Sequence, residues 1–233
     1  AVKRHSSDLP SAKEIGLSAA KKTLKRLNAK KISSTKLPVV FDKRISNDLL
    51  GYLASSISGT SIARGTSFLK DSLGQQIFSK DVTIIDDPAI NRGLGSKPFD
   101  GEGIKVKKRE LVTNGKLNTW ILNTSTAKKL GLKTTGNASR SVGSPPGVST
   151  SNLYMTNGLN TYDDILSSIN YGFYATELIG MGVNLVTGDY SMGASGMLIE
   201  NGEITHAVSE VTIASNLKEI FMNLSAANDL EFK

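Results

Sequence analysis

Two Asn-Gly dipeptides constrain the fold of this chain more than any other feature of its sequence. Asn114-Gly115 and Asn201-Gly202 each separate two segments with the character of β-strands. Asn-Gly is the strongest short-range signal of a two-residue hairpin, because both turn positions need a positive φ. The sequence therefore predicts antiparallel pairing of 105–112 with 116–123 and of 196–200 with 203–213. Further strands are predicted at 37–41, 82–85, 173–178 and 183–187.

Helical periodicity appears between these strands. Residues 11–31 begin with the capping-box pair Ser11 and Glu14, and leucines recur along one face among lysines. We expect this helix to pack on the domain; the alternative is a basic arm for nucleic acid or membrane. Because helices fall irregularly among antiparallel strands, the predicted class is α+β, a mainly antiparallel β-sheet domain with flanking helices. The other predicted helices are 46–58 with Gly59 at its C′ position, 66–73, 125–130, 161–170 and 215–224.

The positive charge of the chain is concentrated at its N-terminus. The net charge is +7, and residues 1–44 hold 12 of the 28 Lys and Arg but only three of the 21 acids, a local charge of +9. The rest of the chain carries −2, so the body of the domain lacks the positive surface that a DNA-binding protein needs. The chain begins with alanine, and we expect it to be a piece of a longer polypeptide. Residues 1–36 are predicted to be a helical arm linking to a missing N-terminal region, and 37–233 to be one domain.

Residue types limit the chemistry of the chain. There is no cysteine, and the two histidines, His5 and His206, lie far apart in the sequence, so no metal site is predicted within the chain. Ser195 lies in a Gly-Ala-Ser-Gly sequence that does not fit a nucleophile elbow. The acid pairs at 86–87 and 163–164 are interpreted as a strand-end turn and the first turn of a helix. With no apolar run long enough to span a membrane and no secretory segment, the cytoplasm is the expected location and no membrane partner is expected.

Two glycine-rich segments allow more than one interpretation. Glycine and serine punctuate 180–196, and small residues in strands let another backbone approach closely. This segment suits a groove in which an extended peptide adds as a strand, a tightly twisted sheet, or a close subunit contact. Residues 135–151 lack any periodicity and are either a long functional loop or a mobile one.

Several collinear segments resemble one protein family. They include 64–68 (Arg-Gly-Thr-Ser-Phe), 83–88 (Thr-Ile-Ile-Asp-Asp-Pro), 177–183 (Glu-Leu-Ile-Gly-Met-Gly-Val) and 186–190 (Val-Thr-Gly-Asp-Tyr). The sequence resembles the PmbA/TldE branch of the TldD/PmbA family, long called modulators of DNA gyrase, from about residue 8 to the end. The TldD branch has an H-E-x-x-x-H helix that binds zinc and supplies the general base. Here the matching positions are Gly51, Tyr52 and Ser56, which cannot replace two imidazoles and a carboxylate.

The resemblance implies a metal-free partner subunit of a TldD/TldE-type heterodimeric metallopeptidase that cleaves small unfolded peptides. No catalytic residue is then expected in this chain, and zinc is expected in the TldD-like partner. One alternative is a gyrase-associated or nucleic-acid-binding regulator that uses the basic arm at 21–26. Another is a stand-alone peptidase with unconventional groups such as Asp189, Ser191, Ser195 or His206. The candidate residues for a peptide groove or subunit contact are Arg64, Gly65, Thr66, Ser67, Gly188, Asp189, Tyr190, Ser191, Gly193, Ser195 and Gly196.

Overall fold

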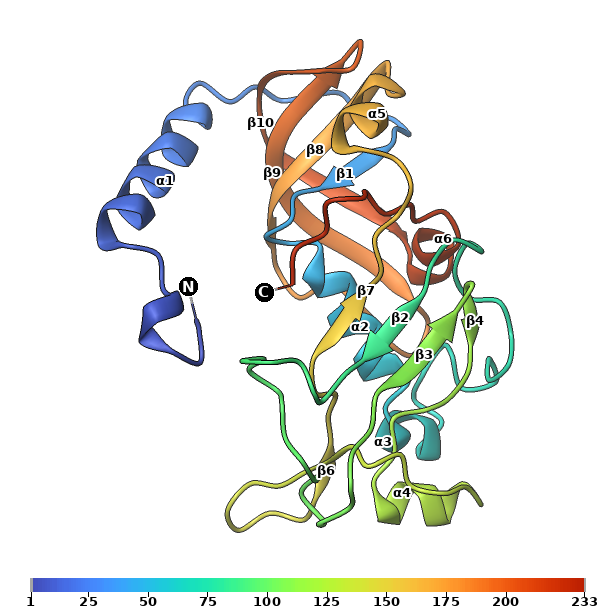
Figure 1. Ribbon diagram of the computed structural model, residues 1–233. Helices are drawn as coiled ribbons and strands as arrows, with labels where there is room; N and C mark the ends of the chain where they lie inside the picture. The colour runs from blue at the N-terminus through green and yellow to red at the C-terminus, as the bar shows by residue number, and fades with distance from the viewer. Residues whose placement is uncertain (1, 233) are drawn as a thin grey trace.

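A four-stranded sheet forms one half of the domain in the computed structural model, which describes residues 2–232 (Figure 1). Its order is β1-β8-β9-β10, in which β1 is parallel to β8 and the other neighbours are antiparallel. At the β9–β10 turn, Asn201 and Gly202 have φ values of 51° and 83°, so the predicted hairpin is confirmed. The strands are β1 (Val39–Phe41), β8 (Tyr171–Ile179), β9 (Asp189–Glu200) and β10 (Glu203–Asn216).

A second sheet, of order β4-β3-β2-β7, forms the other half and is built around the first Asn-Gly turn. Asn114 and Gly115 again have positive φ, but the ladder they join is shorter than the sequence predicts. Residue Lys105 bridges to Phe99 instead, and Ile121 exchanges backbone bonds with Ile57 and Gly59. Pairing with residues outside the hairpin has therefore replaced hairpin pairing at both ends. The strands are β2 (Ile84–Asp86), β3 (Arg109–Thr113), β4 (Lys116–Leu117) and β7 (Leu153–Met155).

The short helices largely follow their capping residues. At α5 a capping box joins Thr161 to Asp164, as the sequence predicts, whereas α4 and α6 begin on asparagines rather than serines. Gly59 is not a helix C′ residue; it opens α3, where a Cβ would lie 2.6 Å from the Leu122 side chain. The helices are α2 (Asn47–Ser56), α3 (Gly59–Ala63), α4 (Thr124–Lys129), α5 (Tyr162–Ser167) and α6 (Leu217–Met222).

Two predicted elements are wrong, and in each case local side-chain bonds explain the difference. Residues 183–187 are a turn rather than a strand, because the Asn184 side chain accepts bonds from the backbone of Val186 and Thr187. Residues 66–73 form turns rather than a helix, because the Ser67 hydroxyl accepts the Leu69 N–H. In both segments a polar side chain competes with regular backbone pairing.

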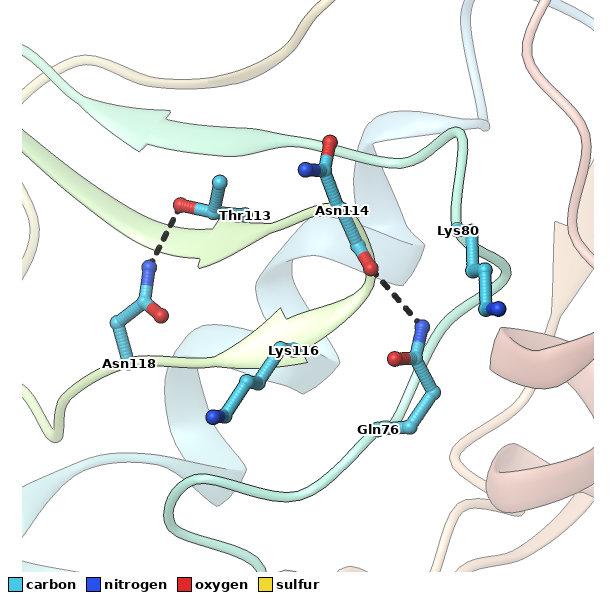
Figure 2. Close-up of a pocket in the computed structure, with 6 residues that line it drawn as sticks. All are labelled: Gln76, Lys80, Thr113, Asn114, Lys116 and Asn118. Carbon is cyan, nitrogen blue, oxygen red and sulfur yellow. Dashed lines mark hydrogen bonds between the residues drawn. The ribbon is translucent and has the colours of Figure 1, made fainter.

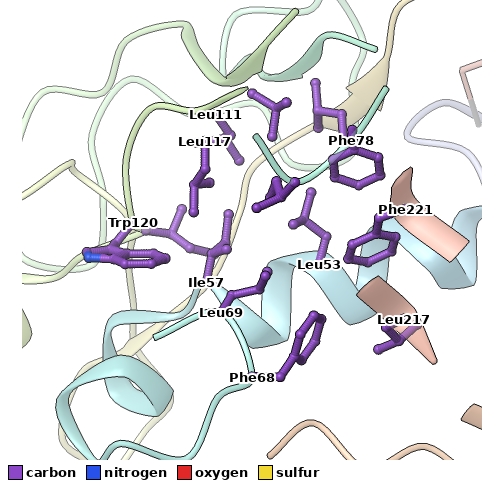
Figure 3. Close-up of a cluster of buried hydrophobic side chains, with 14 of the residues drawn as sticks. Leu53, Ile57, Phe68, Leu69, Phe78, Leu111, Leu117, Trp120, Leu217 and Phe221 are labelled. Atoms are coloured by element: carbon purple, nitrogen blue, oxygen red, sulfur yellow. The ribbon is translucent and has the colours of Figure 1, made fainter. Parts of the chain in front are cut away.

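The largest hydrophobic core lies where α2 and α6 pack between the two sheets (Figure 3). Leu53 of α2 and Ile57, which follows the end of that helix, are completely buried in it. The rings of Phe78 and Phe221 stack with centroids 4.4 Å apart, which joins α6 to the chain before β2. Because one face of α2 packs on this core, the helical geometry fixes whether each of its other side chains faces the core or the solvent.

Helix α1 (Ala12–Lys25) stands away from the body of the domain (Figure 1). Its predicted capping box between Ser11 and Glu14 is present, yet none of its residues is buried, and Leu24 is 66% exposed. The expectation that this helix packs on the domain is therefore wrong. An ion pair joins Arg26 to Glu177, and a 3-10 helix, η1 (Ser6–Asp8), precedes α1. The lysines of α1 account for only part of its exposure, because its leucines are exposed as well.

The glycine- and serine-rich segment 135–151 is fastened at both ends to one buried carboxylate. Asn137 Nδ2 donates to Asp86 Oδ2 at 2.8 Å, and the N–H and hydroxyl of Ser151 donate to Asp86 Oδ1 at 2.7 and 2.6 Å. Between these points, β5 (Ala138–Ser139) pairs with β6 (Gly147–Val148). The segment is thus a hairpin whose two ends are hydrogen-bonded to Asp86 and whose tip is exposed. Asp86 is the last residue of β2, in agreement with the predicted end of that strand. None of the helices within residues 2–232 is long and apolar enough to cross a bilayer.

Candidate functional site

Helix α2 carries the three positions at which the resemblance places lost metal ligands. Gly51 is exposed, with open space where a Cβ would lie, Tyr52 is half-buried, and Ser56 is completely buried. Tyr52 and Ser56 are one turn apart on the same face of α2, whereas Gly51 faces solvent. Within residues 2–232 the Ser56 hydroxyl has no hydrogen-bond partner. The interpretation of these positions as a vacated metal site stays a prediction.

Two tyrosines and an aspartate form a polar cluster between α2 and β9. The rings of Tyr52 and Tyr190 meet edge to face with centroids 6.1 Å apart. Burial raises the pKa of the Tyr190 phenol, and the neighbouring Tyr52 and Asp48 raise it further. Burial also raises the pKa of Tyr52, with a contribution from Asp48, and the pKa of Asp48 itself. Both phenols stay protonated at neutral pH, so the tyrosines offer hydroxyl groups rather than a strong base.

The segment from Arg64 to Ser67 leaves α3 and turns back toward β9. Arg64 caps α3, and Gly65 has a φ of 70°, a conformation that favours glycine. Thr66 is exposed and its hydroxyl bonds to the Ser61 carbonyl, whereas Ser67 is buried. Arg64, Gly65 and Thr66 therefore present the surface of this segment, and Ser67 holds its shape.

Glycines in β9 serve two different purposes. A Cβ on Gly196 would lie 2.0 Å from the Tyr174 carbonyl oxygen, so this glycine permits close approach of β8 within the sheet. Gly193 lies near the exposed end of β9, next to the exposed Ser191. Gly188 is buried, with a φ of 87° at the turn into β9. Close approach of β8 thus accounts for Gly196. Gly193 also pairs with β8, at Ile179, and is half-buried, whereas Ser191 is exposed.

Contacts around Tyr190 bring the three candidate segments together. The Tyr190 ring contacts Tyr52 of α2, and Val183 forms an isolated bridge with Tyr190. The backbone N–H of Phe68, directly after the Arg64 segment, donates to the Leu185 carbonyl at 2.9 Å. Segments distant in sequence therefore meet at one place, and their role as a peptide groove or subunit contact stays a prediction. The candidates exposed or partly exposed there are Arg64, Gly65, Thr66, Asp189, Ser191 and Gly193, whereas Ser67, Gly188, Tyr190, Ser195 and Gly196 are buried.

Sequence reasoning missed two components of this region. Asp48 belongs to the tyrosine cluster, but in the sequence it is only a first-turn acid of a helix. The end of β8 and the residues after it expose apolar side chains, with Ile179 61% exposed and Met181 98% exposed. The glycines that flank Met181 were the only signal in the sequence that the chain turns there.

Two groups of the stand-alone peptidase alternative, His206 and Ser195, make structural contacts. His206 Nδ1 lies 3.3 Å from the hydroxyl of its neighbour Thr205, which fits a structural histidine. Ser195 is 7% exposed and its carbonyl accepts a bond from Thr176. Between residues 2 and 232, no three His, Asp or Glu side chains gather as metal ligands.

A surface hollow of about 440 Å³ lies at the tip of the β3–β4 hairpin and contains none of the candidate residues (Figure 2). Gln76 Nε2 donates to the Asn114 carbonyl at 3.0 Å, and Asn118 Nδ2 donates to the Thr113 hydroxyl at 2.7 Å. The side-chain amides of Gln76 and Asn118 are therefore used to stabilise the hairpin, and the hollow is a consequence of the shape of this turn. Its lining residues are Gln76, Lys80, Thr113, Asn114, Lys116 and Asn118.

Known proteins match this chain over nearly its whole length. The metalloprotease PmbA of Escherichia coli O157:H7 is 40% identical over 231 residues, which are 99% of this chain and 49% of that protein. A PmbA homologue of Haemophilus influenzae is 39% identical over 233 residues, which are 100% of this chain and 50% of that protein. The chain therefore spans about half the length of these relatives.

Solved structures share the fold described above. A Thermotoga maritima protein described as a candidate modulator of a DNA gyrase superposes with a TM-score of 0.88 at 34% identity, covering 97% of this chain and 52% of that one. TldE of Thermococcus kodakarensis superposes with a TM-score of 0.81 at 26% identity, covering 92% and 49%. The α+β class is thus confirmed. Residues 34–233 match the family model described as the PmbA/TldA metallopeptidase C-terminal domain, and the chain belongs to this family.

Proposed function

We propose that this chain is the metal-free, peptide-binding subunit of a two-subunit metallopeptidase of the TldD/TldE type. The observation that carries the proposal is α2, where the motif positions hold Gly51, Tyr52 and Ser56 in a family of metallopeptidases. The Tyr52 ring packs on Tyr190 and the Ser56 side chain is buried in the core, so neither offers a metal ligand of the usual kind. Zinc and the general base then come from a TldD-like partner in the cytoplasm.

The surface around Tyr190 supports a role in holding an unfolded peptide. Ser191 and Gly193 lie on an open part of β9, and the Thr66 turn lies beside the segment that leads into this strand. The backbone of β9 is already paired with β10 and with the chain at 179–184, so a peptide would lie against the small side chains on the face of the sheet. The exposed Met181 adds an apolar contact that does not depend on substrate sequence. A small unstructured peptide is the substrate class that such a surface suits.

Reconstitution of cleavage tests this proposal. The full-length subunit is purified alone and then mixed with its metal-bearing homologue, and cleavage of an unfolded fluorescent peptide is followed. We expect cleavage only in the mixture. A Ser191→Trp variant should lower peptide cleavage by the mixture about tenfold by blocking the open face, whereas Ser139→Trp, exposed on β5, should not. Cleavage by the lone subunit would instead support a stand-alone peptidase.

A nucleic-acid-binding regulator is the second candidate, and the exposure of α1 favours it. Lys21, Lys22 and Lys25 are all exposed on a helix in which no residue is buried. Phosphate contacts by such lysines would make DNA binding fall steeply with salt. Binding at low salt that a change of all three lysines to alanine abolishes would support this candidate, and absence of binding at low salt would remove it.

A further inference from the structure

Positive and negative charge are separated within the body of the domain. Residues 97–140 hold ten Lys and Arg but only three acids, a net charge of +7, whereas residues 141–233 hold two lysines and ten acids, a net charge of −8. The near-zero total for the body of the chain conceals this separation. We call residues 97–140 the basic lobe; they include β3, β4 and α4 and lie mainly in the lower part of Figure 1, whereas β8, β9 and β10 lie in the upper part.

The charge of the basic lobe has few acid partners. Within residues 2–232, Lys108 is the one base of the lobe in an ion pair, with its Nζ 3.6 Å from Asp87 Oδ2. The acidic part of the chain pairs instead with the basic N-terminal segment and compensates part of its charge. These pairs are Arg26–Glu177, Lys31–Glu210 and Lys43–Glu231. The basic lobe therefore carries a positive charge that the described part of the chain leaves almost uncompensated.

The three acids of the lobe are occupied by hydrogen bonds to neutral groups. Asp100 is buried and accepts bonds from backbone N–H groups. Glu102 accepts bonds from the N–H and hydroxyl of Thr124 at 2.9 and 2.6 Å, and Glu110 accepts a bond from the Thr113 hydroxyl at 2.6 Å. These bonds hold the loops of the lobe together, and they leave its lysines to solvent or to a ligand.

Two loops gather the basic residues in space. Arg109 Nε donates to the Thr135 carbonyl at 3.0 Å, and a Cβ on Gly101 would lie 3.1 Å from the Cβ of Arg140. The chain at 101–109 therefore runs alongside the chain at 135–140, which follows the basic last turn of α4. The exposed bases brought together in this way are Lys105, Lys107, Lys128, Lys129, Lys133 and Arg140.

Helix α3 connects the basic lobe to the candidate peptide surface. It begins against α4, because a Cβ on Gly59 would lie 2.6 Å from the Thr126 hydroxyl oxygen. It ends at Ala63, directly before the segment that starts at Arg64. A helix of this length spans about 7.5 Å, which two or three residues of an extended peptide cover. A peptide on the surface around Tyr190 therefore needs only a few further residues to reach α4.

We infer that the basic lobe binds the acidic segment of an unfolded peptide whose other part lies on the surface around Tyr190. Eight of the ten bases of the lobe are lysines, whereas recognition of phosphate favours the paired bonds of arginine. Of its two aromatic residues, Phe99 is exposed and Trp120 is buried, whereas single-stranded nucleic acid stacks successive bases on several exposed rings. Both features favour carboxylates as the ligand. The inference rests on the proposed function and specifies acidic peptides as the preferred substrate class.

Fluorescence anisotropy of two labelled peptides bound to the full-length subunit tests the inference. The peptides share one unfolded sequence and differ only in an added run of Glu or of Gln. We expect the Glu peptide to bind about fivefold more tightly at low salt, because exposed charge pairs are weak singly and act here together. Screening should remove the difference at about 0.5 M salt. A lobe variant in which Lys128, Lys129 and Lys133 are all changed to Gln should bind the two peptides equally at low salt.

The matched control removes the same charge from α1, by changing Lys21, Lys22 and Lys25 to Gln, and should keep the preference. Fluorescence of the buried Trp120 confirms that each variant is folded. Equal affinity of the wild-type subunit for the two peptides, or a preference that the lobe variant retains, would overturn the inference. Tighter binding of a single-stranded oligonucleotide that the lobe variant abolishes would also overturn it and assign the lobe to nucleic acid. Because binding is measured without cleavage, a preference for the Glu peptide without cleavage by the reconstituted mixture would contradict only the proposed function.

Discussion

Removal of the Asp86 carboxylate should release the 135–151 hairpin and destabilise the domain. Asp86 is 4% exposed and accepts three hydrogen bonds, from the Asn137 side chain and from the backbone and hydroxyl of Ser151. A hydrogen bond to a charged group contributes about 1.5–3 kcal/mol, and bonds that share one acceptor group are not additive. Asp86→Ala should therefore cost about 3–5 kcal/mol. Asp86→Asn should cost about 1–3 kcal/mol, because its amide would face the donating amide of Asn137.

Urea unfolding followed by the fluorescence of Trp120 measures the cost, and trypsin cleavage after Arg140 measures release of the hairpin. Both variants should lower the unfolding midpoint, with Asp86→Ala also speeding cleavage. The matched control is Asp163→Ala, which removes an exposed acid from the first turn of α5 and should change stability by less than about 1 kcal/mol. An Asp86→Ala variant as stable as this control, with unchanged cleavage, would refute the view that Asp86 fastens the hairpin.

Three further substitutions test other parts of the structure. Gly196→Ala should cost about 2 kcal/mol or more in urea unfolding, because its Cβ would meet the Tyr174 carbonyl oxygen; a neutral effect would contradict that close approach. Ser11→Ala should lower the helical circular dichroism of α1 by removing its cap, while the unfolding midpoint of the domain stays unchanged; a shifted midpoint would mean that α1 is packed. Burial opposes ionisation of Asp42, but hydrogen bonds, chiefly from Arg44, lower its pKa overall. The stability that ionised Asp42 contributes is therefore present above its unfolded pKa of about 3.9 and is lost as the pH falls through its lower folded pKa. Asp42→Asn should therefore reduce the loss of stability that the domain shows below about pH 4. An unchanged acid limb would contradict this assignment.

The elements predicted correctly from the sequence are those specified by local chemistry. The Asn114 and Asn201 turns follow from a conformation that few residues other than Asn and Gly adopt, and the Thr161 cap from a bond within one turn of helix. The errors arise where distant contacts decide. Strand β7 was missed, because its three half-buried residues become a strand only by pairing with β2.

The candidate site shows the same division. The resemblance identified the segments that meet around Tyr190, but periodicity gave no means of finding that Tyr52 packs on it or that Asp48 lies nearby. Gly193 and Gly196 both lie in the glycine- and serine-rich segment 180–196, and nothing in the sequence distinguishes them. Both pair with β8, and only the structure shows that a Cβ would lie 2.0 Å from the Tyr174 carbonyl oxygen at Gly196 but 3.1 Å from the Ile179 carbonyl oxygen at Gly193.

The zinc content of the full-length subunit, measured alone and in complex with its metal-bearing homologue, tests the central claim most directly. The account predicts no stoichiometric zinc in the lone subunit, whose α2 positions are Gly51, Tyr52 and Ser56, and one zinc for each complex. Stoichiometric zinc in the lone subunit, retained after dialysis, would contradict the account and place the metal ligands elsewhere in the protein.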